Sequence, residues 1–153
     1  MKTDETLNDI VIQNLNITQT FNTQGGLIFG KNLKFTINNF VFRNNVIKNG
    51  NNMYAGSFQL EETNSIISNM EVYNNTVICE NQIRGTIFTF DGGKASFENY
   101  TSSNGRYTSN NRFFFGTDIY FYGNELNITN FKVQNNTYDS KKDTSIEQAG
   151  FSI

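Results

Sequence analysis

The amino-acid sequence predicts an all-β fold, a right-handed parallel β-helix with about five stacked coils of about 30 residues each. Three observations lead to this prediction. An Asn recurs at a near-constant spacing, apolar residues alternate with mixed residues on both sides of it, and small residues precede a further apolar strand upstream. The right-handed winding follows from the general preference of parallel crossover connections. A β-sandwich of short strands is the main alternative, because its strands also alternate.

The composition allows a folded domain and argues against two classes of partner. The 153 residues include 15 Phe and 7 Tyr, which supply enough large apolar side chains for a core. The net charge is −2 and the 12 Lys and Arg residues are scattered, so no concentrated basic patch favours nucleic acid. No stretch approaches the roughly 18 apolar residues of a membrane span. We therefore expect no nucleic-acid partner and no membrane span in this segment.

The recurring Asn marks a corner between two short strands. The chain aligns on it at spacings of 25, 30, 30 and 31 residues: Asn14, Asn39, Asn69, Asn99 and Asn130. An apolar residue stands two positions before each of them. Because side chains alternate along a strand, we expect these five residues to form one inward column: Ile12, Ile37, Ile67, Phe97 and Ile128.

A third strand lies upstream of the corner in each coil. It carries an apolar pair, such as Phe58 with Leu60 or Phe88 with Phe90, and small residues such as Gly25 and Gly26 precede it. Glycine permits the tight turn that such a strand needs at its start. Between this unit and the next coil, four stretches vary in sequence and are expected as loops: 48–54, 78–84, 108–114 and 139–148.

The 26 Asn residues predict hydrogen-bonded ladders along the stack. Equivalent side chains of stacked strands lie about 4.8 Å apart, so the amide of one Asn can reach the next. We expect one ladder at Asn39, Asn69, Asn99 and Asn130. A second is expected at Gln19, Asn44, Asn74, Asn104 and Asn135. Asn also tolerates the left-handed backbone conformation that corners need.

The chain is predicted to be a single domain, residues 1–153, belonging to a longer protein. It divides into a first partial coil, four coils and the start of another: 1–24, 25–54, 55–84, 85–114, 115–148 and 149–153. Phe151 and Ile153 repeat the pattern of Phe58 and Leu60. We therefore expect the C-terminal end to stack on further coils of the same chain or on a neighbouring copy.

The repeat columns resemble the pectin-lyase-like right-handed β-helix superfold over essentially the whole chain. The segment Phe42-Arg43-Asn44-Asn45, followed by Ala55-Gly56-Ser57-Phe58, resembles the F-x-x-N and G-G-A-I repeats of polymorphic outer-membrane autotransporters. Gly25-Gly26-Leu27-Ile28 is close to the second of these motifs. The composition is also similar to that of large ciliate surface proteins with β-helical repeats. These resemblances imply an extracellular structural or adhesive role, without implying an enzyme.

Residue types argue against most catalytic chemistry. The chain has no His and one Cys, which excludes Ser-His-Asp and Cys-His catalysis and the usual zinc sites. Cys79 is expected to be an inert, partly buried thiol. Glu61 and Asp91 fall in one outward column with Lys31 and Tyr122, and two such acids could hold Ca²⁺ or flank a glycosidic bond. The turn signature of Asp91-Gly92-Gly93 explains that acid equally well, so we expect no catalytic residue, metal or cofactor.

Two kinds of outward residue are candidates for binding or modification. Tyr120 and Tyr122 alternate with inward residues, so their rings share an outer face that could bind a partner or a sugar, or could pack under a loop. Among five N-glycosylation sequons, Asn16 and Asn127 are predicted to point outward and are the better acceptors.

The function favoured by these features is a structural or adhesive β-helical module of a large extracellular, cell-surface or filament-forming protein. The alternative is a carbohydrate-active β-helix, either a lyase or hydrolase or a sugar-binding domain derived from one. A cluster of three carboxylates, or an Arg–Asp pair on adjacent coils, would favour the alternative.

Overall fold

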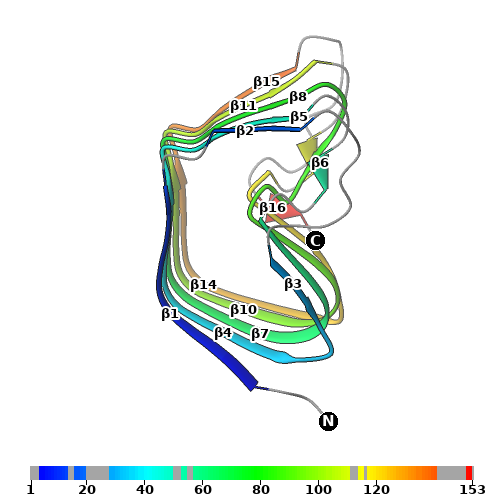
Figure 1. The fold of residues 1–153 in the computed structure, drawn as a ribbon. Helices are drawn as coiled ribbons and strands as arrows, with labels where there is room; N and C mark the ends of the chain where they lie inside the picture. The colour runs from blue at the N-terminus through cyan, green and yellow to red at the C-terminus, as the bar shows by residue number, and fades with distance from the viewer. Residues whose placement is uncertain are drawn as a thin grey trace.

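The computed structural model describes residues 4–13, 16–19, 28–49, 53–54, 57–110, 114–115, 117–140 and 151–152. Within these residues every regular element is a β-strand, and neighbouring strands pair in parallel. The strands stack into a β-solenoid (Figure 1), which confirms the predicted fold class. The right-handed sense of the winding stays a prediction.

The strands form three sheets that run along the stack. The first contains β1 (Asp4–Gln13), β3 (Ile28–Lys31), β4 (Lys34–Arg43), β7 (Phe58–Tyr73), β10 (Phe88–Ser103), β13 (Ile119–Tyr122), β14 (Glu125–Gln134) and β16 (Phe151–Ser152). The second contains β2 (Asn16–Gln19), β5 (Val46–Asn49), β8 (Thr76–Cys79), β11 (Arg106–Ser109) and β15 (Thr137–Ser140). The third contains β6 (Met53–Tyr54), β9 (Ile83–Arg84) and β12 (Phe114–Phe115).

The solenoid has about three complete turns in its described part, fewer than the five coils that the repeat predicted. A complete turn crosses all three sheets, and the third sheet has three strands, β6, β9 and β12. The prediction also counted the partial turns at the two ends. Strands β6, β9 and β12 fall in or beside the stretches that the sequence predicted as loops. Each has only two residues, which is too short to show an alternating pattern.

The register between turns is thirty residues, and thirty-one between β10 and β14, and it confirms the predicted inward column from the second coil onward. Ile37 pairs with Ile67, Ile67 with Phe97, and Phe97 with Ile128. The first three side chains are buried, and Ile128 in the end strand β14 is partly buried. Burying an apolar side chain of this size contributes roughly 1.5–3 kcal/mol, so the column is a main source of stability.

The predicted alignment of the first coil is wrong by five residues. Strand β1 pairs with β4 at a spacing of thirty, with Leu7 opposite Ile37 and Ile12 opposite Phe42. Asn14 lies outside the described residues, but the pairs Gln13–Arg43 and Asn16–Val46 on either side keep the same spacing. At this spacing nine residue pairs join β1 to β4, from Asp4–Lys34 to Gln13–Arg43, whereas a turn of 25 residues would break this continuous pairing.

The first predicted Asn ladder is present. Asn69 Nδ2 donates to Asn39 Oδ1 at 3.0 Å, and Asn99 donates to Asn69 at 2.9 Å. Asn130 donates to Asn99 at 2.8 Å. All four residues have positive φ, between 53° and 61°, so they also provide the left-handed corner. Each amide donates to the preceding coil, which gives the ladder a direction.

The second predicted ladder follows the same pattern, with Asn74 Nδ2 donating to Asn44 Oδ1 at 2.8 Å. Gln19, the predicted first member of this ladder, pairs with Asn49 and not with Asn44, so the prediction is wrong there for the same reason as the alignment of the first coil. A third row, one residue further on, is buried and was not predicted. There Asn75 Oδ1 accepts from the Asn45 backbone N–H at 3.0 Å, and Asn75 Nδ2 donates to the Phe42 carbonyl at 2.9 Å. This row satisfies backbone groups at the corner that water cannot reach.

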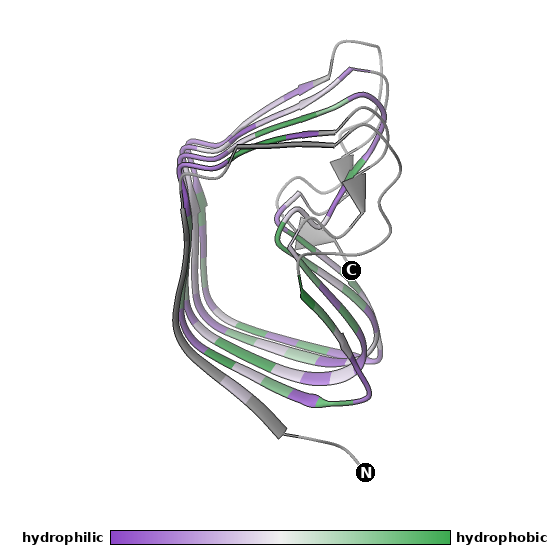
Figure 2. Ribbon diagram, in the orientation of Figure 1, coloured by the Kyte–Doolittle hydropathy of each residue, from purple (hydrophilic) through white to green (hydrophobic). Residues whose placement is uncertain are grey.

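Aromatic rings form the centre of the core. Phe58 and Phe88, from adjacent turns, stack with ring centroids 4.7 Å apart, and Phe40 contacts both rings. Figure 2 shows hydrophobic and hydrophilic residues alternating along β4, β7 and β10. Most of the hydrophobic ones point inward, with Ile66 of β7 as an outward exception.

Candidate functional site

The outer side of β3, β7, β10 and β13 carries two columns of outward side chains. Strand pairing places Phe29, Gln59, Thr89 and Tyr120 in one column, and Lys31, Glu61, Asp91 and Tyr122 in the other. We call these eight residues, together with Glu62, the acidic–aromatic face. The second column is the one expected from the sequence, so the periodicity brought together residues that lie up to about ninety positions apart.

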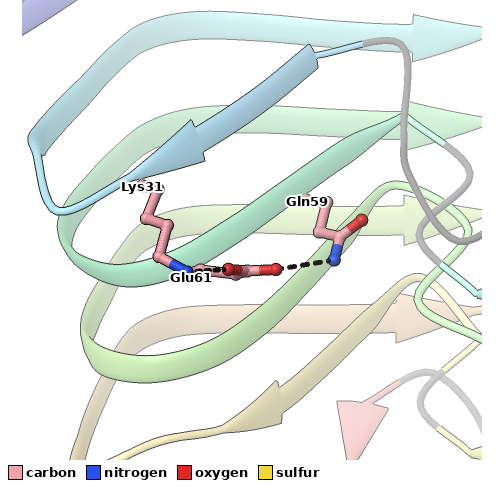
Figure 3. A network of polar contacts seen from close by, with 3 residues as sticks. All are labelled: Lys31, Gln59 and Glu61. Carbon is pink, nitrogen blue, oxygen red and sulfur yellow. Dashed lines mark hydrogen bonds and ion pairs between the residues drawn. The ribbon is translucent and has the colours of Figure 1, made fainter.

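Glu61 is fully engaged in a polar network within this face (Figure 3). Lys31 Nζ lies 2.9 Å from Glu61 Oε2, and Gln59 Nε2 donates to Glu61 Oε1 at 3.2 Å. The hydrogen bond to Glu61 raises the pKa of Lys31, and the nearby charges of Glu61, Asp91 and Glu62 add to this effect. Because the pair is solvent-exposed, it adds little to stability.

Asp91 and Glu62 are the other two acids of the face. Both are exposed, and Asp91 stands beside Tyr122 in the strand pairing. A Cβ placed on Gly92 would lie 2.4 Å from Glu62 Oε1, so the Glu62 carboxylate reaches across to the strand that carries Asp91. Within the described part of the chain, neither acid has an ion pair within 4.0 Å.

The two candidate tyrosines, Tyr120 and Tyr122, differ in their surroundings. The Arg84 guanidinium lies 5.4 Å from the ring centroid of the partly buried Tyr120, so this ring is packed under a neighbouring segment. Tyr122 is 69% exposed. The packing role expected for the pair therefore applies to Tyr120, whereas Tyr122 keeps a ring surface that can bind a partner.

A buried polar cluster around Asp118 was not predicted. The Tyr100 hydroxyl and the Ser102 hydroxyl each donate to Asp118 Oδ2 at 2.6 Å, and the Tyr107 hydroxyl donates to Oδ1. Asp118 is fully buried. Burial raises the pKa of this carboxyl, and the three hydroxyl donors oppose that shift. Burial also raises the pKa values of Tyr100 and Tyr107 well above the ordinary range.

The sequence does contain a signal for this cluster. In the preceding turn the residues paired with Tyr100, Ser102 and Tyr107 are all apolar: Met70, Val72 and Val77. Asp118 takes the place of Ile87, next to the pair Phe88–Ile119. Polar residues that replace apolar ones in several inward columns at once indicate a shared network, since buried polar groups need partners. The cluster joins two neighbouring turns inside the core.

Asn127, a predicted glycosylation acceptor, lies on the outer side of β14. Its side chain is exposed and donates to Glu125 Oε1 at 3.2 Å, while Lys94 Nζ lies 2.5 Å from Glu125 Oε2. These residues border a shallow groove of about 220 Å³. Asn16 is in β2, and its side chain lies outside the described residues. Asn99, another sequon, donates its amide to the ladder, which makes it a poorer acceptor.

The end turn formed by β14 and β15 shows inward side chains to solvent. Phe131 is 43% and Val133 is 38% exposed, although their partners in the preceding turn, Tyr100 and Ser102, are fully buried. In the described part of the chain, β14 pairs with β10 alone. Phe151, an expected stacking residue, pairs with Ile119 through β16, and its stacking on another coil stays a prediction. Ile153 lies outside the described residues.

No family model, curated protein or solved structure matches this chain. A function for this chain is therefore proposed from its fold and from the surfaces described above.

Three further observations concern the described residues. No group of three or more acidic, Cys or His side chains lies close enough together there to hold a metal ion. No helix long and apolar enough to cross a membrane is found in that part of the chain. Cys79 is buried, with its thiol 3.2 Å from the Gln82 carbonyl, as expected for a structural residue.

Proposed function

We propose that this chain is a structural or adhesive β-solenoid module of a large extracellular, cell-surface or filament-forming protein. The same proposal includes a relationship of its repeats to three groups of proteins. These are the pectin-lyase-like superfold, the autotransporter repeats and the ciliate surface proteins. The observation that carries it is the end turn of β14 and β15. Its inward side chains and its strand edge are suited to another coil and not to water.

The ladder polarity supports this use of the end turn. Asn130 donates its amide to Asn99, so its side-chain oxygen remains as an acceptor for the next coil. An added coil with an Asn at its corner would donate to it in the same way that Asn99 donates to Asn69. Such a coil would also cover Phe131 and Val133. Further coils of the same chain, or a neighbouring copy, could supply it.

Sedimentation of residues 1–153 across concentrations tests the proposal. We expect the mass to rise with concentration because the end turn associates, and the double variant Phe131→Lys, Val133→Lys to remain a monomer. Phe29→Lys is the control, since it removes an exposed Phe from an outer face without changing the end turn. A monomer at every concentration, or equal loss of association in the control, would contradict the proposal. Phe151→Lys tests the predicted role of β16 separately.

The extracellular location has its own test, because secreted chains can carry glycans at exposed sequons. Expressed with a secretion signal in a eukaryotic host, the chain should gain glycan mass that decreases in Asn127→Gln and in Asn16→Gln. Antibodies raised against residues 1–153 should label intact cells of the source organism. Labelling of permeabilised cells alone would overturn the proposed location.

The carbohydrate-active alternative has less support. Both carboxylate oxygens of Glu61 are already bound, by Lys31 and by Gln59, so Glu61 is a poor partner for Asp91 in acid–base catalysis. Incubation with polysaccharides that contain uronic acids, followed by detection of unsaturated products, would reveal a lyase. Structural stacking predicts no such product.

A further inference from the structure

Two tyrosines on the outer surface of this solenoid are covered by arginine. The Arg43 guanidinium lies 5.8 Å from the Tyr73 ring centroid, and the Arg84 guanidinium lies 5.4 Å from that of Tyr120. Both distances fall within the roughly 6 Å range of a cation–π interaction. Arg43 also donates a hydrogen bond to the Tyr73 hydroxyl at 2.8 Å. Two outward rings are thus satisfied from within the chain.

Tyr122 is an outward tyrosine of the same kind without such a cover. Its ring is 69% exposed, and within the described residues no cation lies over it. Asp91 is its direct neighbour in the strand pairing, and the Glu62 carboxylate reaches over Gly92 beside Asp91. The one lysine of this face, Lys31, is bound to Glu61. The surface around Tyr122 therefore combines an open ring with two acids that have no ion pair.

We propose that Tyr122, Asp91 and Glu62 form a docking point for an arginine side chain of a partner protein. The guanidinium would stack on the Tyr122 ring, as Arg84 does on Tyr120, and would hydrogen-bond to the adjacent carboxylates. Charge complementarity supports a cation, because Lys31 is paired with Glu61 and Arg84 lies over Tyr120, which leaves Asp91 and Glu62 beside Tyr122. Arginine fits better than lysine, since its planar fork can stack and pair at once. This site is separate from the end turn, so it does not depend on the proposed stacking.

Titration with acetyl-arginine-amide, followed by NMR of labelled tyrosine rings, tests the docking point directly. The Tyr122 ring signals should shift saturably, with a dissociation constant on the order of millimolar, as expected for one exposed contact. Acetyl-citrulline-amide has almost the same shape without the charge and should give no saturable shift. Added salt should weaken the arginine response, because exposed charges are screened.

Variants separate the ring from the acids. Asp91→Asn should weaken arginine binding about threefold, and Tyr122→Leu should abolish it. Because the second variant lacks the Tyr122 ring, its binding is followed by the backbone amide signals of β13. Glu98→Gln is the matched control: it removes the same charge from an exposed position elsewhere on β10 and should leave binding unchanged. All three substitutions are at exposed positions, and thermal unfolding checks that each variant is folded. If Tyr122→Leu fails this check, Asp91→Asn still decides the question.

Three outcomes would overturn the inference: an equal response to citrulline, no effect of Asp91→Asn, or an equal effect of Glu98→Gln. A titration with cellotriose identifies the competing occupant. Saturable Tyr122 shifts with the sugar and none with arginine would assign the ring to a glycan instead.

Discussion

Corner asparagines have two roles that can be separated by substitution. Asn69 adopts a φ of 53° and also carries the hydrogen bonds to Asn39 and from Asn99. The left-handed conformation excludes most side chains, whereas the hydrogen bonds need an amide. Glycine meets the first requirement and not the second, and leucine meets neither.

We therefore expect Asn69→Leu to destabilise the solenoid by about 2–3 kcal/mol and Asn69→Gly by about 1 kcal/mol. Chemical denaturation of both variants measures the two values. If the two variants have equal free energies of unfolding, the left-handed conformation at position 69 costs leucine nothing measurable. A neutral Asn69→Gly would mean that the ladder contributes nothing.

Asp118 predicts an unusual dependence of stability on pH. Burial raises its pKa in the folded state above the ordinary value of 3.8, so between these two values the folded protein binds more protons than the unfolded chain. The stabilisation is complete below the unfolded pKa and is lost as pH rises through the folded pKa. This direction is opposite to that of a salt-bridged carboxylate.

Asp118→Asn keeps an acceptor for the hydroxyl donors and removes the titration. Urea unfolding of this variant should show a smaller loss of stability between about pH 4 and pH 7 than the wild type does. Asp139→Asn, an exposed acid in β15, is the control and should keep the wild-type slope. If Asp118→Asn also keeps it, Asp118 is not the group responsible.

At the level of elements, β7 shows how alternation determines which residues form the core. Ile67 is fully buried, while its neighbour Ile66 points outward and is 45% exposed. The two residues have the same chemistry and adjacent places in the same strand. The difference in their exposure therefore comes from the side of the sheet that each side chain faces.

Ile67→Ala should cost about 2–5 kcal/mol, because it leaves a cavity between two packed turns. Ile66→Ala should change stability by less than about 0.5 kcal/mol. Thermal or denaturant unfolding of the pair provides the comparison. Similar costs for both substitutions would show that the register of β7 is wrong.

Most of this element-level structure could be predicted, and the failures have physical causes. The columns around Asn39, Asn69, Asn99 and Asn130 were predictable because one residue type serves both corner and ladder. The first coil was misaligned because Asn14 matches the motif, while strand pairing favours a constant turn length. The Asp118 cluster was missed because its partners, up to 18 residues away, meet only after the chain winds.

At the scale of the whole molecule, strand pairing in the described part joins each turn only to the turns beside it, so stability should decrease toward an uncovered end. Val72 and Val133 occupy the same inward column in different turns, and they are 2% and 38% exposed. We expect Val72→Ala to cost about 2 kcal/mol and Val133→Ala about 1 kcal/mol or less. Adding a coil beyond β14 should make the two costs converge, and an unchanged difference would contradict nearest-neighbour packing.

The direction of the Asn ladder has a consequence for how the protein is made. In the described ladder, Asn69, Asn99 and Asn130 each donate to an acceptor in the coil that precedes them in the sequence. A coil that leaves the ribosome thus finds its hydrogen-bond acceptors and its apolar floor already in place. The solenoid can fold during synthesis, one coil at a time, with each finished turn serving as the template for the next.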